Sequence, residues 1–254
     1  GIVVFSFLTW MLCLLISRYN KKIIGVFGII LLLSLLVFFK YIPWLSQEYT
    51  IFTVKQFDFE EWVYPAGLSF FTFHSLAIFI SVWKQRIHLP SLLNTIAHIS
   101  FFPTLMAGPV LKSDSISCRL NKPFVFKQIA WTEGVVRIMI GMTFKWVFAT
   151  QAAMVADPIF DGIYNSTYSI WIGIHAYAAQ IFFDFAGYSQ MAIGIALLLG
   201  FSIPENFTSP YTSTSLKEFW RRWHRSLSFF FRDYVYIDAF GGNKYGSSMA
   251  LLAA

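Results

Sequence analysis

The segment SLKEFWRRWHRSLSFFFRDYVY, residues 215–236, concentrates residue types that could do chemistry. It holds four arginines and one histidine, His224, among seven Phe, Trp and Tyr rings that precede Val235. Histidine is the side chain whose ordinary pKa lies nearest neutral pH, so an imidazole in this segment could give or take a proton. The surrounding elements decide what such a proton transfer would serve.

The spacing of these residues predicts one amphipathic helix. Ser215 followed by Glu218 fits a capping box, which marks a helix start, and Glu218 can reach an arginine one turn later. One face of this helix gathers apolar and aromatic residues around the histidine: Trp220, His224, Leu227 and Phe231. An adjacent face gathers arginines: Arg221, Arg225 and Arg232. An aromatic face beside a cationic face is typical of a helix lying in the cytoplasmic interface of a membrane. That structural role explains the arginines but leaves His224 on the apolar side unexplained.

A second polar set lies in the apolar run YAAQIFFDFAGYSQM, residues 177–191. Its members share one face at helical spacing: Gln180, Asp184, Gly187, Tyr188 and Met191. A carboxylate in a membrane segment is costly and faces a partner or a cavity. Asp184 is therefore either a structural residue that holds two helices together or part of the wall of a substrate or proton path.

The sequence contains no HExxH, CxxC, Walker or GxSxG pattern, so we expect no metal and no bound cofactor. We interpret three further histidines in or near apolar segments as packing residues with satisfied hydrogen bonds: His74, His98 and His175. Cys13 and Cys118 do not suggest a disulfide framework.

The composition is that of a membrane protein. Hydrophobic residues make up 57% of the 254 residues and charged residues 13%, with a mean hydropathy of +0.60, whereas a soluble domain has about a quarter of its residues charged. The net charge of +6 is then best explained by lysines and arginines that mark the cytoplasmic side of a membrane. A nucleic-acid partner, which needs a basic soluble surface, is not expected.

Six apolar windows are long enough to cross or enter a bilayer: residues 1–17, 23–39, 64–83, 92–110, 129–155 and 168–203. Proline and glycine in the windows 64–83 and 92–110 predict broken or re-entrant helices. The window 168–203 is too long for one straight span, which predicts a kink or break near Gly187. The fold class expected is an all-α polytopic integral membrane protein, one integral domain over residues 1–254. Because the chain begins at Gly1 inside one apolar run and stops inside another, we expect it to be truncated at both ends.

The distribution of lysine and arginine predicts an orientation. Basic stretches at 18–22, 84–86, 112–127 and 217–232 are expected in the cytoplasm. The acidic loops 40–63 and 154–167 are expected outside. The scheme is consistent only if the window 92–110 enters the membrane and returns to the same side.

Longer stretches of the sequence resemble the membrane-bound O-acyltransferase family, in the bacterial branch of alginate O-acetylation and teichoic-acid D-alanylation proteins. The resemblance rests on FFDFAGYSQMAIGIALLLGF, followed by PENFTSPYTSTSLKEFWRRWHRSLSFFFRDYVYI and GGNK. Earlier pieces resemble the branch in the same order: YPAGLSFFTFHSLAIFI, ISFFPTLMAGPVLK and GMTFKWVFATQAAMVAD. The likeness covers roughly residues 60–245, in a family-like region of about 60–254. The R-D-Y-x-Y-I and G-G-N elements favour the acetyl-transferring, alginate-type subgroup.

The resemblance implies acyl transfer across a bacterial cytoplasmic membrane, from a cytoplasmic donor such as acetyl-CoA to an acceptor on the other side. His224 matches the first of two family histidines and would be the catalytic base, because burial among aromatic rings favours its neutral form. The second family histidine, usually taken as the catalytic one, belongs to a later L-W-H-G element that this chain does not contain. We therefore expect the 254-residue chain alone to be inactive.

Further site residues are carried over from the same motifs. Three would line the core beside the histidine, as parts of the D-F-x-G-Y-S motif: Asp184, Tyr188 and Ser189. Three more are expected to line the core or bind substrate: Asn206, Trp220 and Trp223. Arg221 and Arg222 could receive the phosphates of a CoA-like donor or anchor the helix to lipid headgroups.

The expected partners are membrane lipid, the acyl donor, and either a polysaccharide or an acetyl-transfer protein outside the cytoplasm. Two alternatives stay open: D-alanyl transfer to teichoic acid, and a non-enzymatic transporter or scaffold. A transporter predicts an inverted repeat, and the sequence shows no internal self-similarity.

Overall fold

The computed structural model describes residues 1–50, 65–113, 115–120 and 129–237, without the side chains of residues 42–50, 115, 117 and 118. The regular elements among these residues are helices and include no strand, which confirms the predicted all-α class. Residues 51–63 of the predicted outer loop, Lys122, Lys127 and the GGNK piece lie outside the described residues. The chain divides into two compact units: residues 1–106 with 110–122, and residues 107–109 with 123–254.

Unit 1 is built around α3, the short apolar helix Leu68–Trp83. Its other helices are α1 (Ile2–Tyr19), α2 (Lys22–Thr50), α4 (Leu92–Ile99), α5 (Phe102–Leu105) and α6 (Ser115–Leu120). Helix α3 packs on α1, α2 and α4 and buries most of its side chains. Gly25 and Gly28 let α2 approach closely, because a Cβ at either position would run into the ring of Trp83 or Phe79.

The two windows with proline and glycine differ. The window 92–110 is broken, as predicted, into α4 and α5, which are separated at Ser100 and Phe101. The window 64–83 holds the unbroken helix α3, because Pro65 and Gly67 precede its first turn instead of interrupting it. Gly67 caps α3 with φ of 75°, and a side chain there would collide with the Leu105 carbonyl.

Two buried histidines pack against each other in unit 1. His74 on α3 and His98 on α4 are buried, with ring centroids 5.5 Å apart. His74 Nε2 accepts a hydrogen bond from the Leu111 N–H at 3.3 Å. Both histidines are buried packing residues, as predicted. The satisfied hydrogen bonds predicted for His98 are wrong, since neither of its ring nitrogens has a partner among the described residues.

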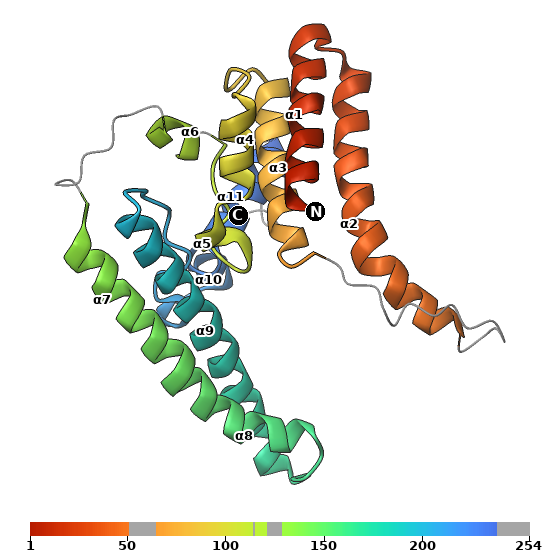
Figure 1. Cartoon of the computed structure of the whole chain (residues 1–254). Coiled ribbons are helices and arrows are strands. Elements are labelled where there is room, and N and C mark those ends of the chain that lie inside the picture. The colour runs from red at the N-terminus through yellow and green to blue at the C-terminus, as the bar shows by residue number, and fades with distance from the viewer. Residues whose placement is uncertain (51–64, 114, 121–128, 238–254) are drawn as a thin grey trace. The chain divides into compact units, whose positions relative to one another are not determined.

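Unit 2 begins with two long antiparallel helical stretches. The first comprises α7 (Trp131–Met142), the π-helix η2 (Thr143–Ala149) and α8 (Thr150–Phe160). The second is α9 (Thr167–Leu198), which lies alongside the first (Figure 1). Ser166 caps α9 by accepting a hydrogen bond from the Ser169 N–H.

Glycines set the spacing of these two stretches. Gly141 faces Gly187, and Gly134 faces Gly194; a Cβ on Gly141 would lie 2.5 Å from the Gly187 carbonyl oxygen. Small residues allow such close contact between membrane helices. A break near Gly187 is wrong, since α9 continues through this position as one helix of 32 residues. Gly187 instead packs closely against Gly141.

The rest of unit 2 folds back along α9. It consists of the 3₁₀ turn η3 (Pro210–Thr212), α10 (Leu216–Arg222), α11 (Arg225–Phe230) and the π-helix η4 (Phe231–Tyr236). The Tyr211 hydroxyl donates to the Ala178 carbonyl at 3.1 Å, far from the end of α9 at Leu198. The single helix predicted over 215–236 is wrong, since α10 ends at Arg222 and α11 starts after His224.

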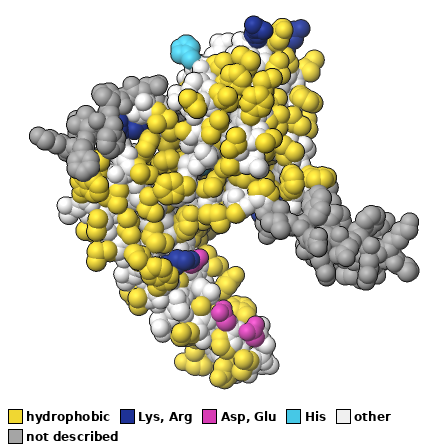
Figure 2. Space-filling model, in the orientation of Figure 1, with side chains coloured by type: hydrophobic (Ala, Val, Ile, Leu, Met, Phe, Trp, Pro, Cys, Tyr) yellow, Lys and Arg dark blue, Asp and Glu magenta, His cyan; other side chains and the backbone are white. Residues whose placement is uncertain are grey.

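The described residues include four helices long and apolar enough to cross a membrane: Ile2–Tyr19, Lys22–Tyr41, Trp131–Phe160 and Thr167–Leu198. Many large apolar side chains on these helices are exposed, and Figure 2 shows hydrophobic side chains spread over the visible face with few charges between them. Such a surface is stable in a bilayer and not in water. The protein is a polytopic membrane protein.

Candidate active site

A short non-helical piece, residues 206–208, explains why the predicted helix breaks. The Thr208 N–H donates to the Arg222 carbonyl at 3.0 Å, and the Arg225 N–H donates to the Asn206 carbonyl at 2.9 Å. In a continuous helix, each of these two groups would instead form a hydrogen bond with another backbone group of the same helix, one turn away. Because the 206–208 piece takes both groups, Trp223 becomes extended and His224 adopts a left-handed conformation with φ of 43°.

The side chain of Asn206 gathers the groups around His224. It is fully buried, and its Oδ1 lies 3.0 Å from His224 Nδ1, 2.7 Å from Ser226 Oγ and 3.4 Å from the Ser226 N. Its Nδ2 donates to Ser189 Oγ at 3.1 Å. These four side chains, which we call the Asn206 cluster, join α9, the 206–208 piece and the start of α11.

The cluster determines where the imidazole carries its proton. A backbone N–H can only donate, so the atom of Asn206 that faces the Ser226 N–H is the oxygen. That oxygen must accept from His224 Nδ1–H as well, which leaves the lone pair on Nε2. Among the described residues, Nε2 has no hydrogen-bond partner, so it is available to take a proton from a substrate.

The half-buried imidazole packs against an aromatic cluster. The rings of His224 and Phe185 of α9 meet edge to face, with centroids 4.7 Å apart. Phe207 contacts both Phe185 and Trp223, at 5.0 and 5.1 Å between centroids. Burial in this setting lowers the pKa of His224 to about 4. The imidazole is therefore neutral at physiological pH, as a proton acceptor must be.

The two adjacent arginines have different surroundings. Arg222 is held by three groups: Glu218 at 2.5 Å, Thr212 Oγ1 at 2.7 Å and the Ser209 carbonyl at 3.3 Å. Its guanidinium thus ties the η3 turn to α10, as expected for a structural residue. Arg221 is exposed and makes no hydrogen bond or ion pair within the described part of the chain.

The capping box predicted at Ser215 forms in a modified way. The Ser215 hydroxyl accepts from the Glu218 N–H at 3.2 Å, which confirms the helix start. The Glu218 carboxylate, however, accepts from the N–H of Thr214 at 2.9 Å instead of that of Ser215. The hydrogen bonds from Thr214 lower the pKa of Glu218. Trp220, one turn on, is half-exposed and does not contact the His224 ring.

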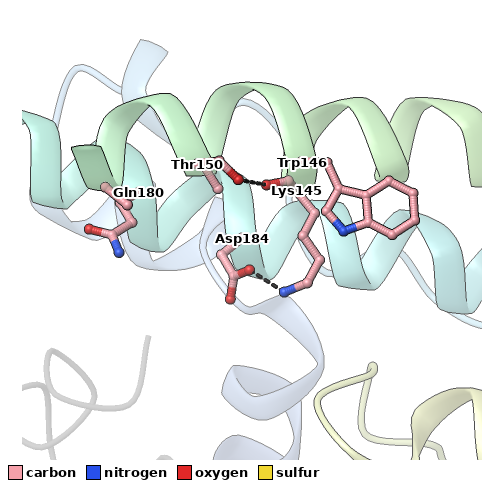
Figure 3. Close-up of a pocket in the computed structure, with 7 residues that line it drawn as sticks. Lys145, Trp146, Thr150, Gln180 and Asp184 are labelled. Carbon is pink, nitrogen blue, oxygen red and sulfur yellow. Dashed lines mark hydrogen bonds and ion pairs between the residues drawn. The ribbon is translucent and has the colours of Figure 1, made fainter. Parts of the chain in front are cut away.

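Asp184 belongs to a different part of unit 2. It lies on α9 next to Phe185, but its carboxylate forms an ion pair with Lys145 of the π-helix η2 (Figure 3). Both residues line a pocket of about 200 Å³ together with Trp146, Thr150 and Gln180. The structural interpretation of Asp184 is thereby supported, since the pair links the two helical stretches. Tyr188 is half-buried on the same helix.

A further ion cluster fixes the loop that carries Asn206. Arg137 of α7 pairs with Glu205 at 2.6 Å and with Glu133 at 3.0 Å, and it donates to Gln190 Oε1 at 2.9 Å. Because Glu205 directly precedes Asn206, Arg137 anchors the 205–206 loop to both long helices.

The predicted site residues therefore fall into separate groups. His224, Asn206 and Ser189 meet in one cluster with Trp223 beside it, whereas Asp184 lines the pocket and Arg222 holds a turn. Sequence analysis missed Ser226, Lys145 and the link from Arg137 to Glu205. Two signals could have revealed these contacts, since Lys145 and Arg137 are basic residues inside an apolar window. No group of three or more metal-ligating side chains lies close enough to hold an ion within residues that the structure describes.

Comparison with known proteins adds a family and relatives. The family model for MBOAT, the membrane-bound O-acyltransferase family, matches residues 3–254. The chain is 39% identical to the probable alginate O-acetylase of Pseudomonas aeruginosa, over 86% of this chain and 43% of that protein. It is 32% identical to the peptidoglycan O-acetyltransferase of Helicobacter pylori, over 88% and 48%. It is also 32% identical to the teichoic acid D-alanyltransferase of Bacillus subtilis, over 67% and 44%. The chain spans less than half the length of these relatives.

Proposed function

Because the chain belongs to the membrane-bound O-acyltransferase family, we propose that it carries the His224 site of an O-acyltransferase. The acyl group is acetyl, taken from a cytoplasmic donor and delivered across the membrane for O-acetylation of a polysaccharide outside the cytoplasm. The main support is the Asn206 cluster, which leaves the Nε2 lone pair of a neutral imidazole free.

The cluster supports a general-base role for His224. A hydroxyl oxygen attacks the carbonyl carbon of the acetyl thioester while its proton passes to Nε2. The carbon–sulfur bond then breaks, and the leaving thiolate takes the proton back from the imidazolium. Asn206 Oδ1 holds the Nδ1–H throughout and so stabilises the imidazolium that forms. The donor is a substrate such as acetyl-CoA and not a resident cofactor.

The relatives support acetyl over D-alanyl as the transferred group. The two relatives named for acetyl transfer align with 86% and 88% of the chain, whereas the D-alanyltransferase aligns with 67%. Their acceptors differ, so the acceptor polymer here is proposed only as a polysaccharide.

All three organisms are bacteria, which supports a place in the bacterial cytoplasmic membrane. A protein outside the cytoplasm that receives the acetyl group is a possible partner, with membrane lipid around the helices.

The proposal is tested with the complete parent protein in proteoliposomes. Acetyl-CoA labelled in the acetyl group is added on the cytoplasmic face, and ester-linked label is measured on a polysaccharide at the other face. We expect labelled ester from acetyl-CoA and none from a D-alanyl donor. Transfer of D-alanine alone, or passage of a solute without any ester, would contradict the proposal. The 254-residue chain by itself is expected to give no ester, because the second family histidine is missing from it.

A further inference from the structure

The pocket beside Lys145 and Asp184 lies at the middle of two membrane-spanning stretches, where charged side chains are unstable in contact with lipid. Asp184 lies near the middle of α9, and Lys145 lies near the middle of the stretch Trp131–Phe160. Their side chains are 54% and 37% exposed. Charged groups at such a depth face a water-filled cavity or protein, and not hydrocarbon. This face of the two helices must therefore meet something polar.

The backbone around Lys145 departs from regular α-helical geometry. Lys145 is in the π-helical turn Thr143–Ala149, and such turns often occur at functional sites because they displace side chains from regular helical positions. The Lys145 ammonium reaches across to Asp184, as Figure 3 shows, and the rest of both side chains borders the pocket.

Gln180 adds a third polar side chain to the lining. Its side chain lines the pocket, whereas its Oε1 is buried and has no hydrogen-bond partner within the described residues. A buried carbonyl oxygen of this kind is costly unless a donor reaches it. Thr150 and Trp146 complete the rim with a hydroxyl and an indole. The pocket thus offers acceptors, donors and an aromatic surface within about 200 Å³.

The charges in the pocket cancel each other. The Lys145 ammonium is paired with the Asp184 carboxylate, so the pocket carries no net charge to attract a phosphate or a carboxylate. A neutral group with several hydroxyls matches this lining, because hydroxyls donate to Asp184 and accept from Lys145. The charge balance argues against the anionic acyl donor as the occupant.

We propose that the Lys145–Asp184 pocket is a hydrated binding site for a neutral, hydroxyl-rich group, such as one sugar unit, reached from outside the cytoplasm. The pocket extends from mid-helix through Thr150 and Ala153, and through Gln180, towards the 161–166 loop. That loop is acidic and is expected outside. The assignment of this ligand to the acyl acceptor rests on the proposed function.

The test uses single cysteines in the complete protein after Cys13 and Cys118 are replaced by alanine. Ala153→Cys places a thiol in the pocket, and Met154→Cys places one at the adjacent exposed, apolar position as a control. A charged, impermeant thiol reagent is added to right-side-out vesicles, and the labelling rates are compared. We expect Ala153→Cys to react at least about tenfold faster, because the reaction needs a thiolate and water.

Protection experiments then identify the ligand class. Maltose should slow the labelling of Ala153→Cys by about threefold at a concentration twice its dissociation constant, whereas inorganic phosphate at equal concentration should not. Equal labelling of the two variants would overturn the hydrated pocket. Protection by phosphate, or by neither probe, would overturn the neutral-ligand assignment. Labelling does not depend on turnover, so protection by maltose without acetyl transfer would count against the proposed function alone.

Discussion

At the scale of single residues, the histidine could be selected from the sequence but its chemical state could not. His224 was the one imidazole placed in an aromatic and basic segment. The tautomer of His224 is set by the hydrogen bond from its Nδ1–H to Asn206, which lies 18 positions away in the chain. Ser226 in turn fixes the orientation of the Asn206 amide. Spacing rules within one helix do not reach such contacts, so Ser226 was missed, and the pairing of Asp184 with Lys145 was not predicted.

The lowered pKa of His224 leads to a prediction for the pH profile. Burial lowers this pKa from 6.5 to about 4, so the imidazole stays neutral as pH falls through 6.5. Acyl transfer by the complete protein should therefore be level from pH 8 to about 5 and fall only near pH 4. The measurement is kcat/KM against pH in proteoliposomes. A fall centred near pH 6.5 would contradict the buried, neutral site.

The lowered pKa of His224 can be tested with a variant of Asn206, and it also makes the stability of the fold depend on pH. Asn206→Asp is nearly isosteric and puts a carboxylate beside Nδ1, so it should move the fall in activity to higher pH. The unfolded chain takes up the proton first as pH drops below 6.5, so His224 contributes stability that is lost as pH falls from 6.5 towards 4.

At the scale of elements, apolar windows predicted the long helices. The local sequence pattern gave wrong predictions at two places: Gly187 and the segment 215–236. The window 168–203 holds one unbroken helix in which Gly187 packs on Gly141, a contact between helices that no single window contains. The 215–236 helix broke because residues 206–208 compete for its backbone hydrogen bonds. Both places involve partners distant in sequence, while the Ser215 cap, a local feature, was predicted correctly.

The glycine contact between α7 and α9 can be tested by adding one methyl group. Gly141→Ala places a Cβ 2.5 Å from the Gly187 carbonyl oxygen, so the helices must separate and the protein should lose roughly 1–3 kcal/mol of stability. Val136→Ile, which adds one carbon at an exposed position on the same helix, should have little effect. Thermal unfolding in detergent measures both. Equal stability of Gly141→Ala and the unchanged protein would show that the helices are not in close contact.

At the scale of the whole molecule, composition predicted a polytopic membrane protein, and the four long apolar helices agree. The orientation in the membrane stays a prediction from lysine and arginine. It can be tested with cysteines at exposed positions: Ser166→Cys at the start of α9 and Lys217→Cys on α10. A cysteine at Ser226, in the same basic stretch, would not serve as a probe, because Ser226 is buried and hydrogen-bonded to Asn206.

An impermeant thiol reagent added to intact cells should label Ser166→Cys and leave Lys217→Cys unlabelled, because the latter lies in the basic, cytoplasmic stretch. Permeabilised cells provide the control, since both positions should then react. Labelling of Lys217→Cys from outside would reverse the orientation.

The most direct test of the central claim, that His224 is the base for acyl transfer, compares two variants of the complete protein. His224→Asn tolerates the left-handed backbone and keeps an N–H for Asn206, while His224→Ala removes both ring and hydrogen bond. Neither variant can accept a proton near pH 7. With both present at normal levels in the membrane, we expect acetyl transfer to fall by about 10²–10⁴-fold in each. Transfer by His224→Asn within about threefold of the unchanged protein would mean that His224 only shapes the fold.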